Sequence, residues 1–388
     1  MSKQRKIIRT KRIYKRKRTK SKALSTIVFI LFLFVLVGFG FIVKGEWSKR
    51  FGPNAPKPSS NTSSDYSESK PSSLVSSGTN SKPDTSDSLK EIKAAYLPSS
   101  QLAQHSADQF KAVMQKFKTD GYNAVYVELK TPEGKIYYNT QNESAKKFNA
   151  VAENPIDLNV LVKAMKDAGL KPLAQMSALK DGIAPHVKNE NSYAFGTTLT
   201  TNWLDNSVDK GGKPWLNPYM DKARSYICDL TKELSTAGFE AIVLDNVMFP
   251  EKNTGKLNLI NENKPKPEIL KQLLQEAQTA AGKAKVLQGI NIEVFANVNA
   301  SGYSNQASAI SYTNLSPIIN MEVVKAKLPE IKTAAQIEGS ETDIVKAILQ
   351  KIQSGNKDVQ FMPVIKQSDL TVLEPILKEL KIENYILM

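Results

Sequence analysis

The chain has very little cysteine and histidine. Among its 388 residues there is one cysteine, Cys228, and there are two histidines, His105 and His186. A single cysteine excludes an internal disulfide and any zinc site built from a cysteine cluster. Two histidines argue against a multi-histidine metal centre and against a histidine-based catalytic triad. We therefore expect no metal site, and a domain that is stabilised by its apolar core.

Acidic residues are missing from the first 22 positions, which carry twelve lysines and arginines. Subtracting these twelve from the net charge of +15 leaves +3 for the remaining 366 residues. The main body is close to neutral, so its charge does not predict a polyanionic partner. We expect no nucleic-acid partner and interpret residues 1–22 as a basic cytoplasmic tail beside anionic lipid.

Charged residues are also absent from residues 23–43, a run of 21 largely apolar residues. As a helix this run would be about 31 Å long, enough to cross a bilayer. A cleaved signal peptide is the alternative, but its apolar region is usually about 7–15 residues long and ends at a small-residue site. The flanking sequence Lys44–Arg50 is a poor cleavage site. We predict an uncleaved transmembrane signal anchor, with the following residues outside the cytoplasm.

Residues 44–90 are predicted to be a serine- and proline-rich linker. The stretch Pro53–Lys90 holds 13 serines and 5 prolines in 38 residues. Such a segment cannot bury enough apolar surface to fold by itself, so it is interpreted as a flexible stalk. The folded domain is expected at residues 91–388.

Short apolar runs alternate with amphipathic helical patterns through this domain. The predicted strands are Ile92–Leu97, Asn123–Leu129, Lys171–Met176, Ala241–Asp245, Asn291–Ala296, Pro317–Glu322, Gln360–Ile365 and Asn384–Met388. The predicted helices are Ser106–Lys118, Ile156–Ala168, Met220–Ala237, Pro267–Gly282, Glu341–Ser354 and Leu370–Leu380. Eight strands alternating with helices favour a closed (β/α)8 TIM-type barrel. An open doubly wound sheet is the alternative, and no Gly-x-Gly-x-x-Gly follows any strand.

Polar residues recur near the carboxyl ends of the predicted strands. Because side chains alternate along a strand, residues two apart share a face. The shared faces are Ala124, Tyr126, Glu128 and Lys130; Leu173, Gln175 and Ser177; Ala241, Val243 and Asp245; Glu293, Phe295 and Asn297; and Ile318, Asn320 and Glu322. If these faces point inward, then Glu128, Gln175, Asp245, Asn297 and Glu322 meet around one mouth of the barrel.

A ring with several carboxylates and few histidines fits glycoside hydrolysis. That reaction needs one protonated acid and one carboxylate that acts as nucleophile or base. The candidate catalytic residues are Asp245, Glu128 and Glu322, and the chemistry implies no metal or organic cofactor. The alternative interpretation is a set of strand-end polar residues that bond to loop backbones. Lys130 is a candidate for substrate binding, or for neutralising Glu128.

The longest irregular stretch, Ser177–Pro218, follows the third predicted strand and contains Trp203 and Trp215. Long loops at this end of a barrel normally build the substrate site. We predict that both tryptophans stack on sugar rings and that Gln175 and Asn297 contribute polar contacts. The alternative is that the aromatic residues only cap the barrel.

Two sequence stretches resemble a known family. Trp215–Tyr219 (WLNPY), followed by a helical pattern and by Gly238–Pro250 (GFEAIVLDNVMFP), is similar to the putative glycoside hydrolase family of bacterial exported TIM barrels. Asn123–Tyr138 resembles an earlier strand of that family. The resemblance covers roughly residues 91–388. It implies a TIM barrel with glycosidase activity, and it places family acids at Asp245 and Glu128.

The chain also departs from the family pattern. The family's Asp-Tyr-Ile-Arg reads Asp-Asn-Val-Met at Asp245–Met248, so an arginine is replaced. Asn314 stands where an acid precedes the sixth strand, and Glu322 is the acid left in that region. Two functions follow. The first is a membrane-anchored extracytoplasmic glycosidase acting on cell-wall or extracellular polysaccharide, and the second is a non-catalytic carbohydrate-binding or wall-organising protein on a degenerate barrel. A third alternative places the main partner site in the cytoplasmic tail.

Overall fold

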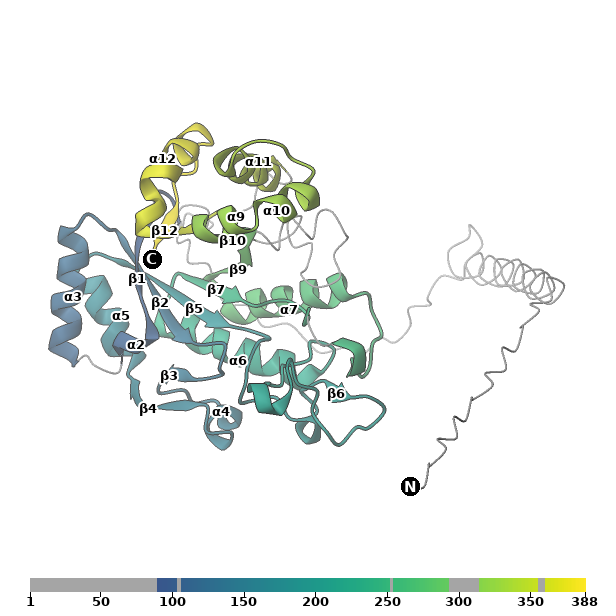
Figure 1. Cartoon of the computed structure of the whole chain (residues 1–388). Coiled ribbons are helices and arrows are strands. Elements are labelled where there is room, and N and C mark those ends of the chain that lie inside the picture. The colour runs from purple at the N-terminus through teal and green to yellow at the C-terminus, as the bar shows by residue number, and fades with distance from the viewer. Residues whose placement is uncertain (1–88, 103–105, 252–253, 293–313, 355–359) are drawn as a thin grey trace, which may run out of the picture. The chain divides into compact units, whose positions relative to one another are not determined.

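The computed structural model describes residues 89–102, 106–251, 254–292, 314–354 and 360–388 (Figure 1). All of them belong to the second of the two units into which the chain divides, Asn80–Met388. The predicted anchor at residues 23–43 lies outside the described residues, as do the basic tail and nearly all of the predicted linker. Among the described helices, none is long and apolar enough to cross a bilayer.

Eight parallel strands form a closed barrel. In the order in which they pair, these are β1 (Lys93–Leu97), β2 (Ala124–Lys130), β5 (Lys171–Ser177), β7 (Ala241–Asp245), β9 (Lys285–Asn291), β10 (Asn314–Ile319), β11 (Val364–Ile365) and β12 (Tyr385–Leu387). β12 pairs with β1 in parallel, which closes the ring. This closure confirms the predicted (β/α)8 barrel and excludes the open sheet.

Helices follow most of the strands and lie outside the ring (Figure 1). They are α2 (Ser99–Leu102), α3 (Ala107–Thr119), α4 (Glu143–Lys147), α5 (Leu158–Asp167), α6 (Asp221–Ala237), α7 (Lys266–Ala281), α9 (Met321–Ala326), α10 (Leu328–Ala335), α11 (Glu341–Ser354) and α12 (Leu370–Glu379). The local sequence determines where several of these helices begin or end. Ser106 and Gln109 form a capping box at the start of α3, and Gly238 ends α6 with φ 103°.

The apolar residues divide into an inner and an outer cluster. The inner one fills the barrel and contains Tyr126, Leu173, Val243 and Leu287. The outer one lies between sheet and helices and contains the alternate strand residues, such as Val127, Ala174 and Leu244. The predicted inward faces of β2, β5 and β7 are therefore confirmed up to Tyr126, Leu173 and Val243. The residue two positions further along each strand comes to the carboxyl-terminal mouth.

Smaller elements elaborate the loops at this mouth. The strands β3 (Ile136–Tyr138) and β4 (Val151–Ile156) extend the sheet beside β2. A separate antiparallel pair, β6 (Ala194–Phe195) and β8 (Leu257–Asn258), joins the loop after β5 to the loop after β7. Short 3-10 helices lie at η1 (Val187–Asn189), η2 (Val208–Lys210), η3 (Thr254–Lys256) and η5 (Gln367–Asp369).

Two predicted strands were misplaced. The fifth was expected at Asn291–Ala296, whereas β9 occupies Lys285–Asn291. Gln288 and Gly289 interrupt the apolar pattern of β9, so its sequence looks less like a strand than the residues after it. The sixth was expected at Pro317–Glu322, but β10 ends at Ile319 and α9 begins two residues later. Asn320 caps that helix by accepting a hydrogen bond from the Glu322 amide, 3.2 Å away.

Candidate active site

Asp245 is the last residue of β7, and its side chain lies at the mouth of the barrel. The residue is buried, with 7% of its surface exposed. The Gln175 amide on the neighbouring strand β5 donates a hydrogen bond to its Oδ2. Its Oδ1 is also buried and has no hydrogen-bond partner among the described residues.

Burial changes the acidity of Asp245. The pKa of its carboxyl group is raised from 3.8 to about 7, and desolvation by burial is the largest cause. Within this net shift, the hydrogen bond from Gln175 lowers the pKa and the negative charge of Glu128 raises it. At neutral pH this carboxyl group is therefore poised between its protonated and ionised forms, as a general acid requires.

Glu128 supplies a second carboxyl group at the same mouth. It lies near the end of β2, half-buried, and pairs in register with Gln175 on β5. Its Oε2 accepts hydrogen bonds from Ser99 Oγ at 2.6 Å and from the Ser99 amide at 3.1 Å. The Tyr96 hydroxyl group also donates to Glu128. These donors fix the orientation of the carboxylate.

Two tyrosines complete the wall next to these carboxyl groups. The rings of Tyr96 on β1 and Tyr126 on β2 have centroids 6.0 Å apart. Burial, together with the charges of Glu128 and Asp245, raises the pKa of both hydroxyl groups. Both therefore remain protonated and can donate hydrogen bonds. Tyr96 and Ser99 were not among the predicted site residues, although the alternation in β1 that buries Ala94 also places Tyr96 inward.

Lys130 does not join the site, which corrects the expectation for it. A β-bulge between Glu128 and Lys130 shifts the register, so Glu128 pairs with Gln175 and Lys130 with Met176. The shift turns Lys130 away from the mouth. Its side chain is 1% exposed, lies 3.0 Å from Asp181 Oδ2 and donates to the Ser177 carbonyl at 2.6 Å. Lys130 therefore neutralises Asp181, not Glu128, and anchors the loop after β5.

The two tryptophans are not exposed sugar platforms, which is a second correction. Trp203 is 1% exposed and packs edge-to-face on Tyr193, with centroids 6.1 Å apart. Trp215 is 7% exposed, and its indole N–H donates to Asp205 at 2.9 Å. A long loop with little regular structure needs a core of its own, and these rings supply it.

Glu322 and Asn297 also differ from expectation. Glu322 lies in the first turn of α9 with an 80% exposed side chain, and it forms an ion pair with Lys366 at 2.9 Å. Glu322 lies in this helical turn because β10 ends at Ile319, three residues before Glu322. Asn297 lies outside the described residues, as does Glu293. The described carboxyl groups that come together at the mouth are thus Asp245 and Glu128.

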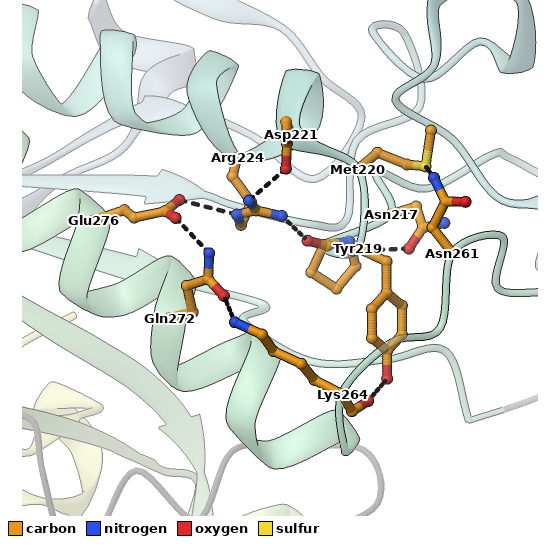
Figure 2. A network of polar contacts seen from close by, with 10 residues as sticks. Asn217, Tyr219, Met220, Asp221, Arg224, Asn261, Lys264, Gln272 and Glu276 are labelled. Carbon is orange, nitrogen blue, oxygen red and sulfur yellow. Dashed lines mark hydrogen bonds and ion pairs between the residues drawn. The ribbon is translucent and has the colours of Figure 1, made fainter. Parts of the chain in front are cut away.

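Two residues of the Trp-Leu-Asn-Pro-Tyr stretch, Asn217 and Tyr219, make structural contacts (Figure 2). The Tyr219 hydroxyl group donates to the Lys264 carbonyl at 2.7 Å, and Asn217 donates to the Leu259 carbonyl. Arg224 on α6 donates to the Pro218 carbonyl at 2.8 Å and to Glu276 of α7 at 2.9 Å. These contacts tie the loop after β7 to the start of α6.

The loop residue that follows Asp245 has a left-handed backbone. Asn246 stands where the family pattern has tyrosine, and its φ is 54°. Asparagine tolerates this conformation better than most residues with a side chain. Its amide donates to Ser177 Oγ at 3.0 Å, which links the ends of β7 and β5.

The described surface also has a cleft whose lining includes neither Asp245 nor Glu128. This cleft of about 1010 Å³ is lined by β3, α4 and α6 residues, with Glu233 among them. The Glu233 carboxylate accepts hydrogen bonds from the Tyr138 hydroxyl group at 3.1 Å, the Thr140 hydroxyl group at 2.6 Å and the Gln141 amide at 2.7 Å. Within the described ranges, no cluster of three or more His, Cys, Asp and Glu side chains could hold a metal ion.

The comparisons with known proteins place the chain in a family. A comparison with curated proteins finds no significant match. Among solved structures, a hypothetical protein from Ruminiclostridium thermocellum is 20% identical, with TM-score 0.43 over 50% of this chain and 96% of that one. The β-amylase catalytic domain from Paenibacillus polymyxa is 11% identical, with TM-score 0.46 over 77% and 93%.

A third solved structure is an exo-β-N-acetylglucosaminidase from Vibrio harveyi, 10% identical with TM-score 0.44, covering 71% of this chain and 41% of that one. These overall likenesses are distant, and the assignment rests on the family match. The model of the family described as "Putative glycosyl hydrolase domain" matches residues 94–321, which confirms the resemblance seen in the motifs. The chain therefore belongs to this putative glycosyl hydrolase family.

Proposed function

We propose that this protein is a glycoside hydrolase in which Asp245 is the proton donor and Glu128 is the nucleophile or general base. The observation that carries the proposal is the pairing of two carboxyl groups in unlike environments at one barrel mouth. Asp245 is buried with its pKa raised to about 7, and Glu128 is half-buried and surrounded by hydrogen-bond donors. This division of roles is the one that glycoside hydrolysis requires.

The chemistry follows from the two environments. Protonated Asp245 gives its proton to the glycosidic oxygen as the bond from that oxygen to the anomeric carbon breaks. Glu128 either attacks the anomeric carbon or removes a proton from the attacking water. Tyr96 and Ser99 hold Glu128 in place for this step. Because Asp245 Oδ2 accepts the hydrogen bond from Gln175, its proton belongs on Oδ1, which has no partner among the described residues. Gln175 Oε1 is a buried acceptor that also has no partner there, and a sugar hydroxyl group is a donor that would satisfy it.

The substrate that we propose is a cell-wall or extracellular polysaccharide. The test is to incubate purified residues 80–388 with cell-wall material and a panel of polysaccharides, and to measure the reducing ends released. Release from at least one glycan is the expected result. Binding without release would instead support a carbohydrate-binding protein on a degenerate barrel, which the replaced arginine at Met248 favours.

Glu128→Ala should lower the hydrolysis rate by about 10³-fold, because the reaction loses its nucleophile or base. If Glu128 is the nucleophile, added azide should restore part of the rate and yield a glycosyl azide, since the small anion can occupy the vacated space. The matched control is Glu322→Gln, which alters the exposed acid at the start of α9 and should leave the rate unchanged. A normal rate for Glu128→Ala would remove Glu128 from the mechanism.

We also propose that residues 23–43 anchor the protein in the membrane with the barrel outside the cytoplasm. The support is the uncharged run of 21 residues preceded by twelve basic ones. Protease added to intact bacterial cells that express the full chain should release the barrel by cutting within residues 44–90. Protection of the barrel in intact cells, with cleavage only after lysis, would contradict this topology.

A further inference from the structure

Gly289 on β9 lies next to the candidate proton donor. In β9 the side chain of Leu287 points into the barrel, and Gly289, two residues later, is on the same face. Leu244 pairs with Gln288, so the next positions along the two strands, Asp245 and Gly289, are level with each other. Gly289 therefore forms the part of the barrel wall that Asp245 faces on the β9 side.

The space beside Gly289 is occupied by the Asp245 carboxyl group. A Cβ atom at position 289 would lie 1.6 Å from Asp245 Oδ1, 2.8 Å from its Cγ and 3.3 Å from its Cα. The first distance is far shorter than any contact between non-bonded atoms. Unlike eight other glycines, Gly289 does not have a positive φ, so its backbone would accept alanine. What position 289 requires is an empty space and not an unusual conformation.

We propose that Gly289 is a positioning residue for Asp245, because its missing side chain leaves the space into which the Asp245 carboxyl group turns. The Asp245 carboxyl group is then held between two strands. Gln175 on β5 donates a hydrogen bond to Asp245 Oδ2, and Asp245 Oδ1 lies against the Gly289 backbone. Any side chain at position 289 would push the carboxyl group away from β9 and disturb its bond to Gln175.

The placement of the carboxyl group matters for its acidity. Burial is the largest cause of the raised pKa of Asp245. A carboxyl group displaced toward the open mouth regains water and ionises at lower pH. The effect on hydrolysis rests on the proposed function, whereas the placement itself does not.

A double-mutant cycle of stability tests the placement without any enzymatic assay. Gly289→Ala, Asp245→Ala and the double variant of the full chain are unfolded in urea. We expect Gly289→Ala to lower the midpoint by about 0.5 M, since overpacking is destabilising, and to have little effect in the Asp245→Ala background. Asp245→Ala removes both atoms that lie within 3 Å of the added Cβ. If Gly289→Ala alone does not fold, recovery of a folded double variant supports the placement equally.

Gly255→Ala is the matched control, because a Cβ at that glycine meets no atom within 4 Å and its φ is not positive. Its midpoint should not change. Equal loss of stability from Gly289→Ala in both backgrounds would overturn the proposal, and so would no loss in either. In the folded Gly289→Ala variant, the loss of activity at alkaline pH should begin at lower pH than in the wild type. An inactive wild type would refute the proposed function but leave the cycle valid.

Discussion

Asp245→Asn is expected to lower the rate of polysaccharide hydrolysis by about 10³-fold or more, because the amide cannot give a proton to the glycosidic oxygen. The substitution keeps the size of the side chain, and an amide oxygen can still accept the hydrogen bond from Gln175. The loss should therefore come from chemistry and not from unfolding. The measurement is the release of reducing ends by residues 80–388 and by the variant, at matched concentration and pH.

Comparing substrates with different leaving groups distinguishes proton donation by Asp245 from its other possible roles. An aryl glycoside whose phenol is acidic leaves without protonation, so the variant should lose only about tenfold in rate on such a substrate. An equally large loss on both substrates would make Asp245 the nucleophile. An unchanged rate on both would exclude it from catalysis.

The pH profile has a defined direction. Asp245 must be protonated to act as an acid, and its pKa is about 7. The wild-type kcat/KM should therefore fall as the pH rises above about 7, approaching tenfold per pH unit. If kcat/KM begins to fall only far above pH 7, a group other than Asp245 donates the proton.

Asp245→Asn should also make the protein more stable at alkaline pH. The carboxyl group has a pKa of about 7 when folded and 3.8 in its ordinary state. Between these values the folded chain holds a proton that the unfolded chain has released, so wild-type stability falls as the pH rises from about 4 to about 7. Below about pH 4 both states are protonated and no cost remains. Above pH 7 the full cost of burying the charge is present, up to about 4 kcal/mol.

The asparagine variant has no charge to bury and should not show this fall. Urea unfolding of wild type and variant at pH 4, 6 and 8 measures this difference. We expect nearly equal free energies of unfolding at pH 4 and a more stable variant at pH 8. Asp209→Asn changes an exposed acid in η2 and controls for the general effect of charge. A variant that is less stable than wild type at every pH would show that other groups in the folded protein stabilise the buried Asp245 carboxylate.

Local patterning was enough to predict the barrel and the centre of the candidate site. Strand β7 coincides with its predicted bounds, and alternation along β2, β5 and β7 correctly brought Glu128, Gln175 and Asp245 to one mouth. These predictions succeed because alternation depends only on neighbouring residues within one strand, and because parallel strands of a barrel all end at the same face. The family motif around Asp245 carried the same information.

Features that depend on contacts between distant segments could not be predicted in this way. The bulge that turns Lys130 toward Asp181 depends on the register between β2 and β5, and the burial of Trp203 depends on a loop that folds over Tyr193. Gly289 looks like an interruption of β9 until the side chain of Asp245 is placed beside it. Periodicity within a segment reports which side chains share a face. The environment of each carboxyl group, and with it the division into acid and base, arises only when separate strands pack together and exclude water.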